Sequence, residues 1–125
     1  MRIRLLLVDD NERLRDSLGG FLTNLGGLEI VGTASTGKQA VEQCAKLHPD
    51  MVLMDIRMPE MDCIAATRLI HEQYPDIQVV VLTSGFIAEA EAALDAGATV
   101  YVFKTASAYT ILDTIHSTYS NNHPH

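Results

Sequence analysis

A chain of 125 residues, 47% of them hydrophobic and 20% charged, has the length and composition of one folded domain, and this excludes a disordered chain. Its formal net charge is −7, and its nine lysines and arginines are scattered along the sequence. This balance argues against nucleic-acid binding by this chain alone, because neutralising phosphates requires clustered basic side chains.

No apolar stretch approaches the roughly 20 residues that a transmembrane helix needs, and the first residues lack the features of a signal peptide. Cys44 and Cys63 show no metal-ligand spacing. We interpret them as reduced thiols, which suit the cytoplasm. We therefore expect a cytoplasmic protein with no membrane contact.

Short apolar runs recur along the chain, and each predicts a strand. Several have apolar residues at consecutive positions, as in parallel strands that are covered on both faces. The run at 28–34 is more mixed, which suits the edge of a sheet. The predicted strands span residues 3–8, 28–34, 51–54, 77–82 and 99–103.

Amphipathic helical patterns fill the intervals between these runs. Glycine or proline residues end four of the patterns, and Asn11 before the first is a suitable helix cap. The predicted helices span residues 14–25, about 40–47, about 63–74, about 88–96 and 108–119. Alternating strands and helices predict an α/β fold, with a doubly wound, five-stranded parallel sheet and helices on both faces.

The last six residues, SNNHPH, are polar and end in proline and histidine. We expect them to be frayed. The predicted domain therefore spans residues 1–120, and residues 121–125 are expected to be a disordered tail or the start of an interdomain linker.

Polar and charged residues follow four of the predicted strands. In a doubly wound sheet, ligands bind beyond the carboxyl ends of the strands, so these residues are expected to meet at one edge. They combine three carboxylates, a hydroxyl and an ammonium group. The residues are Asp9 and Asp10 after the first strand, Asp55 after the third, Thr83 after the fourth and Lys104 after the fifth.

This set of groups suits phosphoryl transfer. Three neighbouring carboxylates repel one another unless a cation is bound, and oxygen ligands of this kind suit Mg²⁺ (magnesium). One carboxylate can then act as a nucleophile and form an acyl phosphate. Lys104 would neutralise charge on the transferred group, and Thr83 would donate a hydrogen bond to it.

Four motifs in this order, VDD, DIRMPEMD, LTS and DAGATVYVFK, make the chain resemble the receiver domain of two-component response regulators. The resemblance implies a flavodoxin-like, CheY-like fold with strand order 2-1-3-4-5. It also implies a role for each residue of the predicted site. The implied phosphoacceptor is Asp55, assisted by Thr83 and Lys104 as the catalytic pair. The implied Mg²⁺ ligands are Asp9, Asp10, Asp55 and the Arg57 backbone carbonyl. The implied switch consists of Thr83 and Tyr101.

The segment DIRMP and the Lys104-Thr105 pair resemble regulators of the NarL/FixJ type, which carry a LuxR-type, helix-turn-helix output domain. The implied partners are a sensor histidine kinase and a second copy of the chain on phosphorylation. DNA would be contacted only through an output domain that this chain lacks. The alternative is a single-domain regulator that acts by protein–protein interaction.

The sequence departs from the family pattern at two positions. Thr105 stands where many receivers have a proline, so a cis peptide after Lys104 would cost about 3 kcal/mol and is not expected. Cys63 replaces a glycine and is expected to alter the start of the third helix. The Arg57 side chain is expected to hang over the site and limit water access.

Three other functions fit the sequence less well. A haloacid-dehalogenase-type phosphatase needs a second acid two residues after its nucleophile, where this chain has Arg57. A flavin binder needs a loop that accepts phosphate, and DDNER would repel it. An unphosphorylated pseudo-receiver would not need the complete acidic set. We therefore expect a phosphorylation switch that assists its own phosphoryl transfer and dephosphorylation, and not an enzyme acting on a separate substrate.

Overall fold

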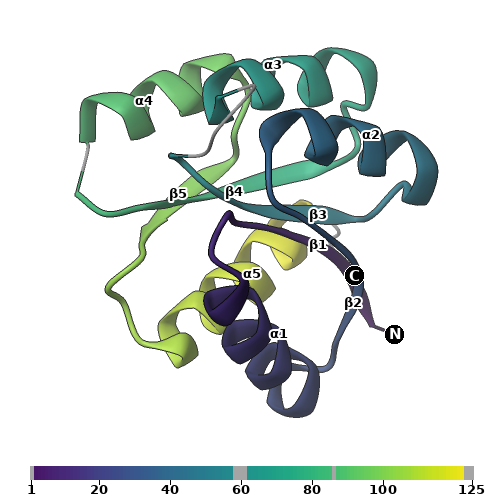
Figure 1. Ribbon diagram of the computed structural model, residues 1–125, viewed down its shortest axis with the longest axis vertical. Helices are drawn as coiled ribbons and strands as arrows, with labels where there is room; N and C mark the ends of the chain where they lie inside the picture. The colour runs from purple at the N-terminus through teal and green to yellow at the C-terminus, as the bar shows by residue number, and fades with distance from the viewer. Residues whose placement is uncertain (1, 58–61, 86, 123–125) are drawn as a thin grey trace.

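The predicted apolar runs form one parallel sheet, in the order β2-β1-β3-β4-β5, in a computed structural model that describes residues 2–57, 62–85 and 87–122. Helices alternate with the strands along the chain (Figure 1). The predicted fold class and strand order are confirmed. The elements are β1 (Ile3–Val8), α1 (Glu12–Gly26), β2 (Leu28–Ala34), α2 (Gly37–Leu47), β3 (Met51–Asp55), α3 (Cys63–Gln73), β4 (Gln78–Thr83), α4 (Ile87–Ala96), β5 (Val100–Phe103) and α5 (Ala108–Asn122).

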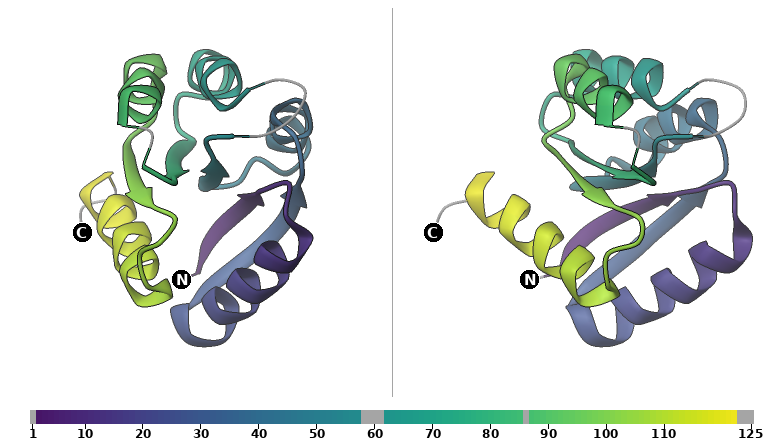
Figure 2. Two further views of the ribbon diagram at one scale, coloured as in Figure 1. Left: turned by 60° about the vertical axis from the view of Figure 1, so that its left-hand side comes forward. Right: turned by 90° about the vertical axis from the view of Figure 1, so that its left-hand side faces the viewer.

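Helices cover both faces of the sheet, as Figures 1 and 2 show. Helices α1 and α5 lie on one face, and α2, α3 and α4 lie on the other. Neighbouring residues of β1 therefore enter different cores: Leu5 and Leu7 pack with α1 and α5, whereas Leu6 and Val8 pack on the opposite side. Burial on both faces explains why the strand residues are apolar at consecutive positions.

The ends of β3 and β4 lie one residue later than predicted. Strand β3 includes Asp55, which pairs with Leu82, and β4 ends at Thr83, which pairs with Phe103. Both polar residues are thus held in the sheet rather than in the loops that follow it. Their backbones are fixed by the hydrogen bonds of the central strands.

Three helix ends differ from the expectation by two residues or more, because polar residues extend the helices beyond their apolar patterns. Helix α1 begins at Glu12, behind an Asn11 cap that accepts a hydrogen bond from the Leu14 N–H at 3.2 Å. Helix α2 begins at Gly37, behind a Thr36 cap. Helix α5 continues to Asn122, past the expected boundary at residue 120. Residues 120–122 are therefore helical, and residues 123–125 lie outside the described residues.

Helix α3 begins at Cys63, and its Asp62 cap accepts a hydrogen bond from the Ala65 N–H at 2.7 Å. The Cys63 side chain is buried, with its sulfur 3.9 Å from the Thr67 hydroxyl. Among the described residues there is no cis peptide bond, so the bond after Lys104 is trans, as Thr105 favours. No helix in the described part of the chain combines the length and apolar character needed to cross a membrane.

Candidate phosphoryl-acceptor site

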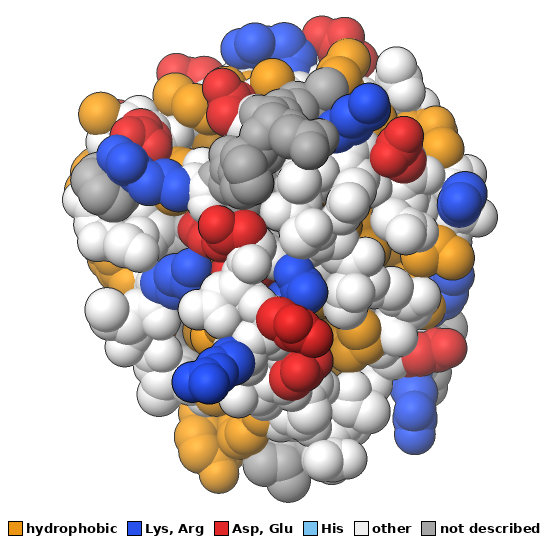
Figure 3. All heavy atoms as spheres, viewed as in Figure 1, with side chains coloured by type: hydrophobic (Ala, Val, Ile, Leu, Met, Phe, Trp, Pro, Cys, Tyr) orange, Lys and Arg blue, Asp and Glu red, His pale blue; other side chains and the backbone are white. Residues whose placement is uncertain are grey.

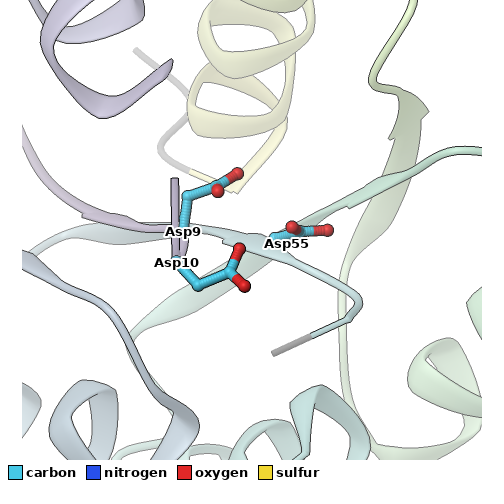
Figure 4. A group of neighbouring side chains, drawn as sticks. All are labelled: Asp9, Asp10 and Asp55. Atoms are coloured by element: carbon cyan, nitrogen blue, oxygen red, sulfur yellow. The ribbon is translucent and has the colours of Figure 1, made fainter. Parts of the chain in front are cut away.

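The three predicted carboxylates meet at the carboxyl edge of the sheet. Figure 4 shows Asp9 and Asp10 at the end of β1, next to Asp55 at the end of β3. Each offers an oxygen that lies within 4.8 Å of the other two. Asp9 and Asp55 are 1% and 4% exposed, whereas Asp10 faces solvent. Two of the three charges are thus held away from water, and charges repel one another more strongly in a buried site than in water.

Asp9 is fixed by contacts to both of its side-chain oxygens and to its backbone. Its Oδ1 accepts a hydrogen bond from the Asn11 N–H at 2.8 Å, and its carbonyl accepts one from the Arg15 guanidinium. Its Oδ2 lies 3.1 Å from the Lys104 ammonium but is buried without a hydrogen bond of suitable geometry. This buried oxygen is an acceptor that a cation, or a water bound to one, would satisfy.

Lys104 reaches two of the carboxylates from the end of β5. Its Nζ lies 2.7 Å from Asp55 Oδ2, and its backbone N–H donates to the Thr83 carbonyl at 2.7 Å. Burial alone would lower the pKa of Lys104, but the hydrogen bond to Asp55 and the negative charges of Asp55 and Asp9 outweigh burial and raise it. The ammonium is therefore charged at neutral pH and offsets one of three negative charges.

Thr83 and Tyr101 lie close together in the sheet. Thr83 is buried at the end of β4, one position beyond the Leu82 that pairs with Asp55. Tyr101 pairs with Val81, two positions earlier on β4. Its ring is half-buried against the core on the α4 side and makes an edge contact with Phe103, at 6.0 Å between ring centroids. The predicted switch residues are thus neighbours across one pair of strands.

Arg57 contacts the site through its backbone, while its side chain reaches α4. Its N–H donates to Asp55 Oδ1 at 3.3 Å. Its guanidinium forms an ion pair with Glu89, with 2.8 Å between Nη2 and Oε1. Sequence analysis missed Glu89, and also the Arg15 contact to the Asp9 carbonyl. A single acid in the first turn of a helix gives no sign of a partner 32 residues earlier in the chain.

The charged side chains and the two cysteines complete the description of the domain. On the face shown in Figure 3, Lys and Arg side chains are interspersed with Asp and Glu side chains. Cys44 and Cys63 are free and buried. Burial raises the pKa of each thiol to about 12, so both are protonated at neutral pH. These thiols are packing groups rather than nucleophiles.

A doubly wound sheet with buried carboxylates and a lysine at its carboxyl edge is the architecture that the sequence resemblance implied. Residues 5–116 match the family model described as the response regulator receiver domain. The chain therefore belongs to this family. The family match favours the receiver function over the phosphatase and flavin-binding alternatives.

Relatives and solved structures agree with that assignment. The chain is 40% identical over 123 residues to the response regulator protein VraR of Staphylococcus saprophyticus, an alignment that covers 97% of this chain and 58% of VraR. The chain thus spans little more than half the length of this relative. It is also similar to VraR of Staphylococcus aureus, at 41% identity over 120 residues, which cover 94% of this chain and 57% of that protein.

Among solved structures, the fold matches the receiver domain of NarL from Mycobacterium tuberculosis, with a TM-score of 0.90, 24% identity, and coverage of 95% of this chain and 97% of that one. At this identity the match shows the fold alone. The likeness to NarL-type receivers that the sequence suggested is supported by a LuxR-family two-component response regulator from Aurantimonas, whose structure has a TM-score of 0.90, 26% identity, and coverage of 97% of this chain and 87% of that one.

Proposed function

We propose that this domain accepts a phosphoryl group on Asp55 and thereby switches the activity of an output. The observation that carries the proposal is the buried Asp55 carboxylate, 2.7 Å from the Lys104 ammonium, at a sheet edge with two further carboxylates. Such a carboxylate can act as a nucleophile, and nearby positive charge stabilises the transferred group. The proposed donor is the phosphohistidine of a sensor histidine kinase.

The transfer replaces one bond to phosphorus by another. One oxygen of the Asp55 carboxylate bonds to phosphorus as the phosphorus–nitrogen bond of the phosphohistidine breaks. The bonding electron pair returns to the imidazole nitrogen. Lys104 offsets negative charge on the transferred oxygens, and the Thr83 hydroxyl donates a hydrogen bond to one of them. The same groups assist the later hydrolysis of the acyl phosphate.

The donor set at this edge fits Mg²⁺, which prefers carboxylate and carbonyl oxygens. Asp10, Asp55 and the Arg57 backbone carbonyl would hold the ion. Asp9 would act through a water bound to the ion, because its Oδ1 already accepts from the Asn11 N–H and its buried Oδ2 lacks a hydrogen-bond donor that such a water would supply. When bound, the ion supplies positive charge that neutralises the carboxylates and the phosphoryl oxygens.

Phosphorylation would change the conformation by adding about −1.5 to −2 charge at Asp55. We propose that Thr83 and Lys104 shift towards the phosphoryl group and that Tyr101 turns inward into the space that Thr83 leaves. The surface formed by α4, β5 and α5 then repacks. This is a population shift between two packings, limited by the contacts that the phosphoryl group makes in each.

The proposed output is transcription, controlled from the cytoplasm. The alignment covers 58% of VraR, so that relative extends beyond the matched region. The resemblance of DIRMP and the Lys104-Thr105 pair to NarL/FixJ-type regulators supports a DNA-contacting domain as the output. Dimerisation on phosphorylation would then bring two such domains together. The alternative is a single-domain regulator that binds a partner protein directly, and the repacked surface serves either mode.

The test is phosphorylation by acetyl phosphate in the presence of Mg²⁺, followed by intact-mass measurement. The carboxylate displaces acetate, so one phosphoryl group should be added to wild type and none to Asp55→Asn. Asp113→Asn, which changes an exposed carboxylate on α5, is the matched control and should be modified like wild type. Equal modification of Asp55→Asn and wild type would contradict the proposal.

A further inference from the structure

An ion pair joins the phosphorylation site to helix α4. Arg57 begins next to the phosphoacceptor, with its N–H 3.3 Å from Asp55 Oδ1, and its guanidinium ends 2.8 Å from Glu89 Oε1. Glu89 lies in the first turn of α4, where the positive end of the helix dipole favours a carboxylate. Arg57 therefore links the loop after Asp55 to the start of a helix on the surface that is proposed to repack.

Helix α4 packs on the rest of the domain mainly through small side chains. Its buried residues are Ala90, Ala93 and Ala96, while Leu94 is only partly buried against the core and Ile87 is 38% exposed. An alanine buries one methyl group, whereas the core-facing leucines and isoleucines of α1 and α5 bury several carbons each. Contacts made by such small side chains offer little resistance to a shift of α4. A polar link at its first turn therefore has a proportionately large influence on where α4 sits.

The Arg57–Glu89 pair is also easily exchanged. Both side chains are substantially exposed, at 58% and 41%, and exposed ion pairs contribute little to stability. Phosphorylation would place about two negative charges and three acceptor oxygens beside the Arg57 backbone. A guanidinium binds such a group through two parallel hydrogen bonds and prefers it to a single carboxylate contact.

We propose that Glu89 is a positioning residue for the phosphorylation site. In the unphosphorylated domain it holds the Arg57 guanidinium on the first turn of α4. When Asp55 is modified, Arg57 exchanges Glu89 for the phosphoryl group, and the start of α4 is released from its link to the site. This inference rests on the proposed phosphorylation of Asp55 and adds a residue and a route by which it reaches α4.

The test measures the affinity for beryllofluoride, a phosphoryl mimic, by calorimetry at saturating Mg²⁺. Glu89→Gln removes the competing carboxylate without changing its shape, so the mimic should bind about two- to fivefold more tightly, the range for an exposed ion pair. Arg57→Gln should bind more weakly than wild type. Adding Glu89→Gln to Arg57→Gln should then change the affinity little, because there is no guanidinium left to release.

Glu91→Gln is the matched control, since it removes the same charge from an exposed position of the same helix. It should bind the mimic almost as wild type does. In an independent readout, the Arg57 side-chain Nε–H resonance in NMR should move when beryllofluoride is added to wild type. Thermal unfolding of each variant, which should match wild type closely, separates these effects from loss of the fold.

Two results would overturn the inference. One is an equal effect of Glu89→Gln and Glu91→Gln, which would leave only the loss of one negative charge. The other is tightening by Glu89→Gln that persists in the Arg57→Gln background, which would mean that Glu89 repels the anion directly. Failure of the wild-type chain to take up a phosphoryl group at all would instead contradict the proposed function.

Discussion

Replacing Lys104 by methionine should destabilise the domain markedly in the absence of Mg²⁺. The ammonium lies 2.7 Å from Asp55 Oδ2 and 3.1 Å from Asp9 Oδ2. Among the residues that the structure describes, Lys104 is the one with a positive charge in contact with both carboxylates. Their side chains are 6% and 1% exposed, so water cannot replace the lost charge. Methionine keeps much of the volume of lysine and leaves two buried carboxylates uncompensated.

The size of the effect follows from the burial of this triad. Removing one partner of a fully buried ion pair costs about 3–5 kcal/mol, and the Lys104 side chain is 24% exposed, so we expect about 3 kcal/mol. For 125 residues, an unfolding entropy of about 2.1 cal/mol/K per residue converts this to a fall in Tm of about 11 °C. Mg²⁺ should restore much of the loss.

Thermal unfolding followed by far-UV circular dichroism, with and without millimolar Mg²⁺, measures both effects. Lys38→Met, at an exposed position of α2, is the matched control and should unfold within a few degrees of wild type. The ion should raise the Tm of Lys104→Met more than that of wild type, because in wild type it competes with the ammonium. A Lys104→Met protein as stable as wild type without Mg²⁺ would refute the electrostatic account of the site.

Three further outcomes can be checked on the same protein. Asp10→Asn should weaken Mg²⁺ binding in calorimetry more than Asp9→Asn does, because the exposed Asp10 would contact the ion directly and Asp9 would act through water. The reverse order would contradict this division. Cys44 and Cys63 should react with a thiol reagent only after denaturation, since burial raises their pKa to about 12, and rapid labelling of the native protein would be inconsistent with it. The free energy of unfolding should fall as pH rises above about 8.5, because the thiols lose protons in the unfolded state and keep them in the folded state. The contribution of the charged Lys104 to the free energy of unfolding is present below about pH 10.5 and should be lost above it, because folding raises the pKa of Lys104. A urea series from neutral to alkaline pH should show this decline, and a flat or rising profile would count against both pKa shifts.

The sheet and the meeting of the carboxylates could be predicted because both depend on backbone topology. Apolar residues at consecutive positions mark strands that are covered on both faces, and parallel strands end at one edge. Asp9 and Asp55 therefore meet although they are distant in sequence. The helix boundaries at Gly37 and Asn122 were missed because the polar residues there carry no apolar period, and only the hydrogen bonds of the helix define them.

The Arg57–Glu89 pair could not be predicted, because it depends on the conformations of two flexible side chains, one in the loop after β3 and one in the first turn of α4. Arg57 was expected to hang over the site, and its backbone does border Asp55, but its guanidinium pairs with α4. The contact of Lys104 with both Asp55 and Asp9 is an intermediate case. Topology places the three residues at one edge, whereas the choice of oxygen atoms is set by side-chain conformation.

Locating the modified residue tests the central claim most directly. An acyl phosphate of aspartate is reduced by borohydride to a primary alcohol, and peptide mass spectrometry then identifies the position. After incubation with Mg²⁺ and acetyl phosphate, the account predicts reduction at Asp55, and none when Mg²⁺ is withheld. Reduction at another aspartate, or no reduced residue in a protein that has been exposed to both reagents, would contradict it.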